Sequence, residues 1–171
     1  MAFRKILCVM FLLVLGLVSA DDCPPFWTRY DNYCYRFFGP PKTWQSAEEH
    51  CGEFFTRDGQ GRLASAHSSG ENNFLLQMWS TSLVPNDGVV GASVWIGLND
   101  LANEGRFTWS DGTSLNDYNA GWRTGQPDDG GQAEDCGCFW RTTEQVGWND
   151  EGCGSALPYI CKMPSYYNRE Q

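Results

Sequence analysis

The sequence predicts an α+β domain that is cross-linked by disulfides. Three observations predict it: two stretches with helical spacing of apolar residues, several short stretches with the pattern of strands, and many cysteines in a chain of single-domain length. Because structural disulfides persist in oxidising compartments, a chain of this composition is expected outside the cytosol.

The first twenty residues have the composition of a cleaved secretory signal. Arg4 and Lys5 precede an apolar run from Ile6 to Val18, and the small residues Ser19 and Ala20 suit cleavage by a signal peptidase. The run is too short to span a bilayer comfortably. We therefore expect residues 1–20 to be removed, residues 21–171 to form one secreted domain, and no membrane span to remain.

The first half of the mature chain predicts a hairpin and two helices. Aromatic and polar residues alternate from Cys23 to Phe38 around a turn at Asp31 and Asn32, as in paired short strands. Thr43 is a suitable cap for a helix reaching Phe55, and a second helix is expected from about Ser69 to Trp79. The apolar stripe of each helix is typical of a face that packs on the core.

The second half predicts strands separated by a long loop. A buried strand is expected over residues 94–98, and strands resume at residues 136–141, 147–148 and 158–161. Between them, residues 99–135 are rich in Gly, Asn and Asp and have little periodicity. A loop of this length in one domain is expected to be ordered by something other than apolar burial.

The charge of the chain is strongly acidic. The net charge of −9 becomes −11 when the two cations of the signal are removed, which argues against nucleic acid as a partner. Many oxygen donors fall in the loop-rich half, and calcium, which binds six to eight oxygens, would neutralise them. Solvated surface carboxylates are the alternative. The residues are Asp100, Glu104, Gln126, Asp128, Asp129, Glu134, Asp135, Asn149, Asp150 and Glu151.

Seven cysteines remain after the signal, and spacing alone does not pair them. Cys23 and Cys34 could clip the predicted hairpin, but six cysteines have fifteen pairings and the seventh is left over. Structural zinc is the competing use of cysteine. It is disfavoured because no CxxC motif occurs and the two histidines lie far from the closely spaced Cys136 and Cys138.

Four spaced motifs occur in the mature chain. They are Trp95-Ile96-Gly97-Leu98-Asn99-Asp100, Gln126-Pro127-Asp128, Glu134-Asp135-Cys136 and Gly147-Trp148-Asn149-Asp150. In order and spacing these motifs resemble the signature of the C-type lectin domain family, and within it the small soluble echinoderm lectins of the echinoidin kind. The resemblance covers essentially the whole mature chain. It implies an α+β double-loop fold with two helices, two small antiparallel sheets and a long calcium-ordered loop.

The resemblance also implies two calcium sites and places a cis peptide bond before Pro127. The principal site, which also binds the sugar, corresponds to Gln126, Asp128, Glu134, Asn149 and Asp150, with the backbone carbonyl of Asp150. An auxiliary site corresponds to Asp100, Glu104, Asp129 and Asp135, with Glu134 shared.

The family's disulfides imply the pairs Cys23–Cys34, Cys51–Cys161 and Cys136–Cys153. Cys138 remains. It either joins two chains in a disulfide-linked homodimer, stays free, or replaces Cys136, since alternate residues of a strand point to opposite faces.

In the family, adjacent sugar hydroxyls complete the calcium shell and hydrogen-bond to the same ligands. The order Gln126, Pro127, Asp128 resembles the galactose-type subgroup, so glycans carrying galactose or N-acetylgalactosamine are the expected partners. One departure weakens this expectation. An aromatic residue that stacks on the sugar often follows the motif, but Gly130 and Gly131 stand there, with Trp122 or Trp140 as substitutes if they are not buried in the core.

Two other classes of function remain. A matrix protein could adsorb calcium mineral through the acidic face, although the chain lacks the proline-rich repeats or long acidic runs common in such proteins. An enzyme is disfavoured because neither His50 nor His67 lies in a recognisable nucleophile motif and the clustered acids are better explained as metal ligands.

Overall fold

The computed structural model describes residues 22–82, 93–115 and 118–166. The predicted signal segment lies outside the described residues. Within them the chain forms two α-helices, ten strands and one short 3-10 helix. None of the helices in this part of the chain is long and apolar enough to cross a membrane.

One mixed sheet of eight strands runs through the molecule. Its strands lie in the order β1-β2-β10-β6-β8-β9, and β5 and β7 pair with β10 and β6. The bounds are β1 Thr28–Tyr30, β2 Tyr33–Lys42, β5 Arg62–Leu63, β6 Ser93–Asn99, β7 Thr108–Trp109, β8 Cys136–Arg141, β9 Val146–Glu151 and β10 Leu157–Pro164. The predicted hairpin is confirmed, because β1 and β2 pair across Asp31 and Asn32.

The α+β class is confirmed, while the sheets differ in arrangement from two small antiparallel ones. β10 is antiparallel to β2 but parallel to β6, where Tyr159 pairs with Trp95. This single parallel pairing joins the N-terminal strands to β6, β8 and β9 in one sheet. The other sheet consists of β3 (Phe55–Thr56) and β4 (Gly59–Gln60). Two-residue strands of this kind have no periodicity to detect in the sequence.

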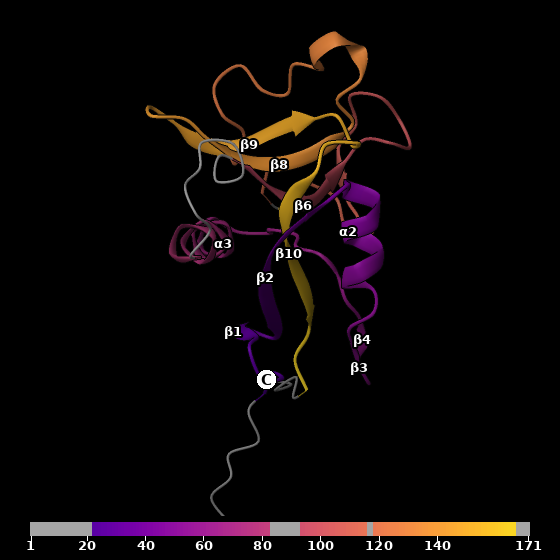
Figure 1. Cartoon of the computed structure of the whole chain (residues 1–171), viewed down its shortest axis with the longest axis vertical. Helices are drawn as coiled ribbons and strands as arrows, with labels where there is room; N and C mark the ends of the chain where they lie inside the picture. The colour runs from indigo at the N-terminus through magenta and orange to yellow at the C-terminus, as the bar shows by residue number, and fades with distance from the viewer. Residues whose placement is uncertain (1–21, 83–92, 116–117, 167–171) are drawn as a thin grey trace, which may run out of the picture.

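Both predicted helices form, and each begins at a capping side chain. Helix α2 (Trp44–Cys51) begins after Thr43, whose side chain accepts a hydrogen bond from Ser46 N. It ends before the predicted Phe55, because Gly52 already caps it through the carbonyls of Glu48 and His50. Helix α3 (Ser69–Thr81) begins after Ser68, which caps Glu71 N. Figure 1 shows the helices on opposite sides of β2 and β10.

The two ends of the described chain lie together, away from the acidic loops. Tyr166 N donates to Asp22 O at 2.8 Å. The disulfides Cys23–Cys34 and Cys51–Cys161 fix this half to the sheet. In Figure 1 the 3-10 helix η1 (Gly130–Gln132) and strands β8 and β9 occupy the opposite end of the molecule. The fold therefore presents the acidic loops at one end.

Candidate functional site

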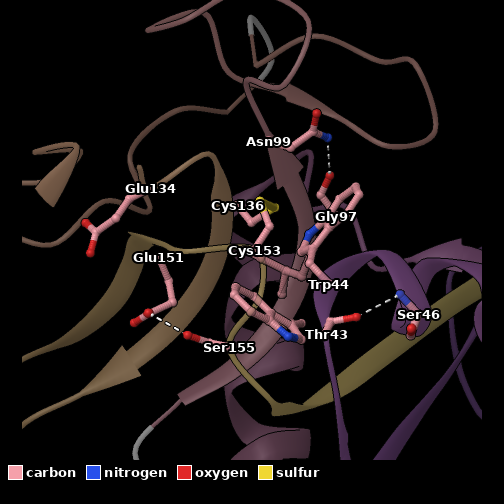
Figure 2. The surroundings of a disulfide bond; sticks show 12 residues. Thr43, Trp44, Ser46, Gly97, Asn99, Glu134, Cys136, Glu151, Cys153 and Ser155 are labelled. Atoms are coloured by element: carbon pink, nitrogen blue, oxygen red, sulfur yellow. Dashed lines mark hydrogen bonds between the residues drawn. A yellow bond between two sulfur atoms is a disulfide. The ribbon is translucent and has the colours of Figure 1, made fainter. Parts of the chain in front are cut away.

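Strands β8 and β9 form the platform of the candidate site. They pair in register, with Cys138 opposite Asn149 and Cys136 opposite Glu151. The disulfide Cys136–Cys153 ties the start of β8 to the segment after β9 (Figure 2). All three disulfides are the pairs that the resemblance implies. In Figure 2 Glu134, two residues before Cys136, points away from the disulfide.

Three carboxylates meet above this platform. One oxygen from each of Asp128, Glu134 and Asp150 lies within 4.8 Å of the other two. Asp150 is completely buried, whereas Asp128 is exposed. Three negative charges at this separation repel one another unless a cation lies between them. The cluster therefore has the shape and charge of a cation site that opens to solvent.

The loop before β8 is folded around the buried carboxylate of Asp150. The backbone amide of Asp129 donates to Asp150 Oδ2 at 2.7 Å, and the amide of Asp128 donates to the same oxygen at 3.0 Å. The chain then turns at Asp129, which has a left-handed backbone with φ 44°. This turn lets Asp129 Oδ1 accept Glu134 N at 3.2 Å. Asp150 thus positions the other two members of the cluster.

Gly130 lies against the carboxylate of Glu134. Its amide donates to Glu134 Oε2 at 2.9 Å. A Cβ at position 130 would lie 2.8 Å from that same oxygen, so a side chain there would require the Glu134 carboxylate to shift from its position in the cluster. Gly131 has φ 71°, a backbone conformation that favours glycine. The two glycines that the sequence presents in place of a stacking aromatic therefore suit the loop and the placement of Glu134.

Asp100 is the buried member of the expected auxiliary site. Asp100 is 3% exposed, and its Oδ2 accepts Gly105 N at 2.7 Å. Burial and the charge of Asp135 raise the pKa of Asp100. The charges of Asp100, Asp129 and Asp135 raise the pKa of Glu104. These carboxylates are not in the group of described acidic residues whose ligand atoms lie within 4.8 Å of one another, which consists of Asp128, Glu134 and Asp150.

Two buried oxygens next to these carboxylates have no hydrogen-bond partner among the described residues. They are Asp100 Oδ1 and Gln126 Oε1, one in each expected site. Buried oxygens without a donor are rare because each loses its hydration, so they indicate an absent partner. An oxygen donor set of carboxylates and amides suits a hard divalent cation. The residues of the principal site, where three carboxylates meet, fit such an ion. At the expected auxiliary site the supporting observation is the unpartnered Asp100 Oδ1 alone.

The electrostatic environment of Glu134 also favours a bound cation. Burial raises the pKa of the Glu134 carboxyl, and the charges of Asp150, Glu151 and Asp128 raise it further. The hydrogen bond from Gly130 opposes this rise. In the absence of a cation this carboxylate is held in an environment that disfavours its charge, which a bound cation would reverse.

Arg123 is a site residue that sequence reasoning missed. Its Nη2 donates to Asn149 Oδ1, and its guanidinium lies 5.5 Å from the centre of the Trp140 ring. The sequence offered one signal: Arg123 is one of only two cations between residues 99 and 135, in a stretch that is otherwise acidic.

The two candidate stacking tryptophans are both engaged in packing. Trp122 packs edge-on against two aromatic rings. The distance between ring centres is 4.9 Å to Phe107 and 5.8 Å to Trp148. Trp140 is partly buried and carries the guanidinium of Arg123 over its ring. This packing agrees with the interpretation that both tryptophans belong to the core.

Cys138 does not have the exposure that a link between chains requires. It is the free cysteine among the described residues. Its side chain, on strand β8, is 0% exposed and belongs to the hydrophobic core. Burial raises the pKa of its thiol well above the usual value. The structure also pairs Cys136 with Cys153, so the expectation that Cys138 replaces Cys136 is wrong. Of the three fates considered, the structure shows the buried free thiol, and a covalent homodimer through Cys138 is not proposed.

Comparison with known proteins places these features in a family. The model of the Lectin C-type domain matches residues 40–163. The alpha-N-acetylgalactosamine-specific lectin of Patiria pectinifera is 42% identical over 172 residues, covering 95% of this chain and 98% of the relative. Echinoidin of Heliocidaris crassispina is 38% identical over 153 residues, covering 83% of this chain and 97% of the relative.

A solved structure supports the same assignment. The C-type lectin CEL-I from Cucumaria echinata has a TM-score of 0.71 and 33% sequence identity, covering 82% of this chain and 96% of that one. The relatives from Patiria pectinifera and Cucumaria echinata are both named as lectins. The family match over most of the chain, the shared fold and the echinoderm relatives together show that this chain belongs to the C-type lectin domain family.

Proposed function

We propose that the protein is a secreted lectin that binds carbohydrate through calcium and prefers galactose or N-acetylgalactosamine. The observation that carries this proposal is that carboxylate oxygens of Asp128, Glu134 and Asp150 meet within 4.8 Å of one another, beside the unpartnered oxygen of Gln126. The three disulfides suit an extracellular protein.

We assign the principal calcium site to five side chains and one carbonyl. Asp128, Glu134 and Asp150 supply negative charge, and Gln126 and Asn149 supply neutral amide oxygens. Together these groups give the mixture of carboxylate, amide and carbonyl oxygens that calcium binds. We assign the auxiliary site to Asp100, Glu104, Asp129 and Asp135, with Glu134 between the two sites.

The same side chains would recognise the sugar. Calcium, when bound, supplies open coordination positions for two neighbouring hydroxyls. Each carboxylate accepts a hydrogen bond from a hydroxyl, and each amide NH₂ donates a hydrogen bond to a hydroxyl oxygen. The ligands therefore fix which arrangement of hydroxyls fits. Affinity at one site is expected to be weak because water competes for these hydrogen bonds.

Two observations support the galactose-type preference. The amide of Gln126 precedes the acid of Asp128, with the cis peptide Gln126–Pro127 between them. The Patiria relative, at 42% identity, is named as specific for alpha-N-acetylgalactosamine. Because no ring follows the motif at Gly130 or Gly131, the preference over mannose is expected to be modest.

A column test separates this proposal from mineral adsorption. The protein is loaded in calcium on immobilised galactose and washed with mannose, with N-acetylgalactosamine and then with a chelator. We expect little elution by mannose and elution by N-acetylgalactosamine. The chelator is expected to elute the protein that remains. Failure to bind the galactose column in calcium, together with retention on calcium phosphate, would instead favour the mineral-binding function.

A further inference from the structure

A pocket with a volume of about 470 Å³ adjoins the motif that the proposed function uses to bind the sugar. Pro127 forms part of its wall, and in the sequence Pro127 stands between Gln126 and Asp128. The volume falls within the range of about 300–1,000 Å³ that is usual for small-molecule sites. The pocket therefore has room for a further part of a ligand that begins at the motif.

One wall of the pocket is tied to strand β9, which carries two of the proposed calcium ligands. Trp122 lines the pocket and packs edge-on against Phe107, another lining residue, with 4.9 Å between ring centres. Trp122 also forms a parallel β-bridge with Trp148, and Trp148 N donates to Gly121 O at 2.7 Å. Because Trp148 directly precedes Asn149 in β9, this wall has a fixed place relative to the proposed calcium site.

Another part of the lining comes from the chain around β7. Thr108 pairs with Asn99 of β6 and forms an antiparallel bridge with Ser114. The carbonyl of the next residue, Leu115, accepts Tyr118 N at 3.2 Å. Thr108, Ser114 and Leu115 all line the pocket, so these backbone contacts give it a defined shape.

The lining combines apolar surface with hydrogen-bonding groups. Phe107, Leu115 and Pro127 are apolar, Arg106 offers N–H donors, and Asn119 offers both a donor and an acceptor. The described residues that line the pocket include no carboxylate, so it lacks the donor set that calcium needs. A sugar ring presents the matching chemistry, because it carries C–H groups on its faces and hydroxyls at its edge.

We propose that this pocket binds the second sugar residue of a glycan whose terminal galactose or N-acetylgalactosamine is held at the calcium site. The inference rests on the proposed function and makes the ligand an oligosaccharide. Arg106 and Asn119 hydrogen-bond to hydroxyls of the second residue, and Phe107 packs against its C–H groups. Because the second residue is tethered to the first, its contacts add to the weak affinity of the terminal sugar.

Calorimetric titration of the full chain in saturating calcium tests this proposal. The probes are methyl galactoside and a panel of disaccharides that carry terminal galactose in different linkages. At least one disaccharide is expected to bind about tenfold more tightly than methyl galactoside, the scale of one or two hydrogen bonds.

Three variants test whether this pocket causes the difference. Arg106→Met and Asn119→Ala remove hydrogen-bonding groups, and Asn119→Trp fills the pocket. Both positions are exposed, so melting temperatures are expected to stay close to that of the wild type. Each variant should lower the affinity for the preferred disaccharide toward that for methyl galactoside, while the affinity for methyl galactoside stays unchanged.

Arg141→Met is the matched control for loss of an arginine. Arg141 is exposed, its guanidinium lies 4.3 Å from the centre of the Trp79 ring, and it does not line the pocket. This variant is expected to bind both probes like the wild type.

Each outcome decides the matter. Loss of the disaccharide preference in the pocket variants, with methyl galactoside binding retained, supports the proposal. It is overturned if no disaccharide binds more tightly than methyl galactoside, or if the preference survives both Arg106→Met and Asn119→Trp. An equal loss in Arg141→Met would assign the effect to net charge and overturn it too. If neither probe binds in calcium, the proposed function fails and this inference fails with it.

Discussion

The buried carboxylate of Asp150 accepts the backbone amide of Asp129 at 2.7 Å. This bond fixes the turn that brings Asp128 and Glu134 to Asp150. The loop is therefore organised by a charged group, and its order depends on how that charge is balanced. Several consequences can be measured.

Calcium is expected to raise the melting temperature. Because the folded site binds the ion and the unfolded chain does not, stability should increase by about 2.7 kcal/mol at a calcium concentration of about 100 times Kd. Protease cuts between Asn99 and Asp135 are expected only in chelator. Differential scanning fluorimetry and limited proteolysis test this. Identical melting curves in calcium and in chelator would count against both metal assignments.

Exchanging the acid and the amide around Pro127 should change sugar preference. Gln126→Glu with Asp128→Asn keeps the net charge and the number of oxygen donors, so calcium affinity should change little. The donor and acceptor are reversed across the site, and preference should move toward mannose and glucose. Competition assays measure this. A double variant that still prefers galactose would show that these two positions do not set specificity.

Substitution of Gly130 should weaken calcium binding. From the sequence alone, Gly130→Trp could be expected to strengthen galactose binding by adding a ring. The structure predicts the reverse, because any Cβ there meets the Glu134 carboxylate. We expect Gly130→Ala to reduce calcium affinity about tenfold, as displaced supporting groups commonly do. Gly154→Ala, where a Cβ meets nothing within 4 Å, is the control and should bind normally.

Cys138 should be unreactive in the native protein. Its thiol is buried and its raised pKa keeps it protonated, so both access and nucleophilicity are low. Iodoacetamide is expected to label one thiol per chain only after unfolding in denaturant without reductant. A dimer band on a non-reducing gel, lost in Cys138→Ser, would contradict this assignment.

Acid should destabilise the protein through a site remote from calcium. Burial raises the pKa of Asp111, but His67, whose Nε2 lies 3.8 Å from Asp111 Oδ2, and hydrogen bonds from Ser65 and Thr113 outweigh burial and hold the pKa well below its usual range. A depressed pKa gives stability that is present above the unfolded value, about 3.9 for Asp, and is lost as pH falls through the folded value.

Asp111→Asn should therefore cost about 2 kcal/mol at pH 7, the scale of hydrogen bonds to a charged group. In chelator, its melting temperature should fall less than that of the wild type between pH 7 and pH 3. Parallel pH profiles for the two proteins would show that Asp111 does not contribute in this way.

Much of the fold could be predicted because its signals are local. The turn at Asp31 and Asn32, the cap Thr43 and the apolar run of β6 each depend on neighbouring residues. The joining of the strands into one sheet could not be predicted. It depends on the pairing of Tyr159 with Trp95, which are distant in sequence.

The candidate site was also predictable only in part. The resemblance to the C-type lectin signature implied which acids belong together, and Asp128, Glu134 and Asp150 do meet. The contact of Arg123 with Asn149, and the contact that a side chain at position 130 would make with Glu134, depend on side-chain reach in three dimensions. The burial of Cys138 depends on which face of β8 meets the core. None of these has a signature in the sequence.

The central claim is that calcium and carbohydrate share the site at Asp128, Glu134 and Asp150. Calorimetric titration of N-acetylgalactosamine into the protein, first in saturating calcium and then in chelator, tests this claim most directly. We predict binding heat in calcium and none in chelator, with Glu134→Gln losing most of the heat in calcium. Equal sugar affinity in calcium and in chelator would contradict the account.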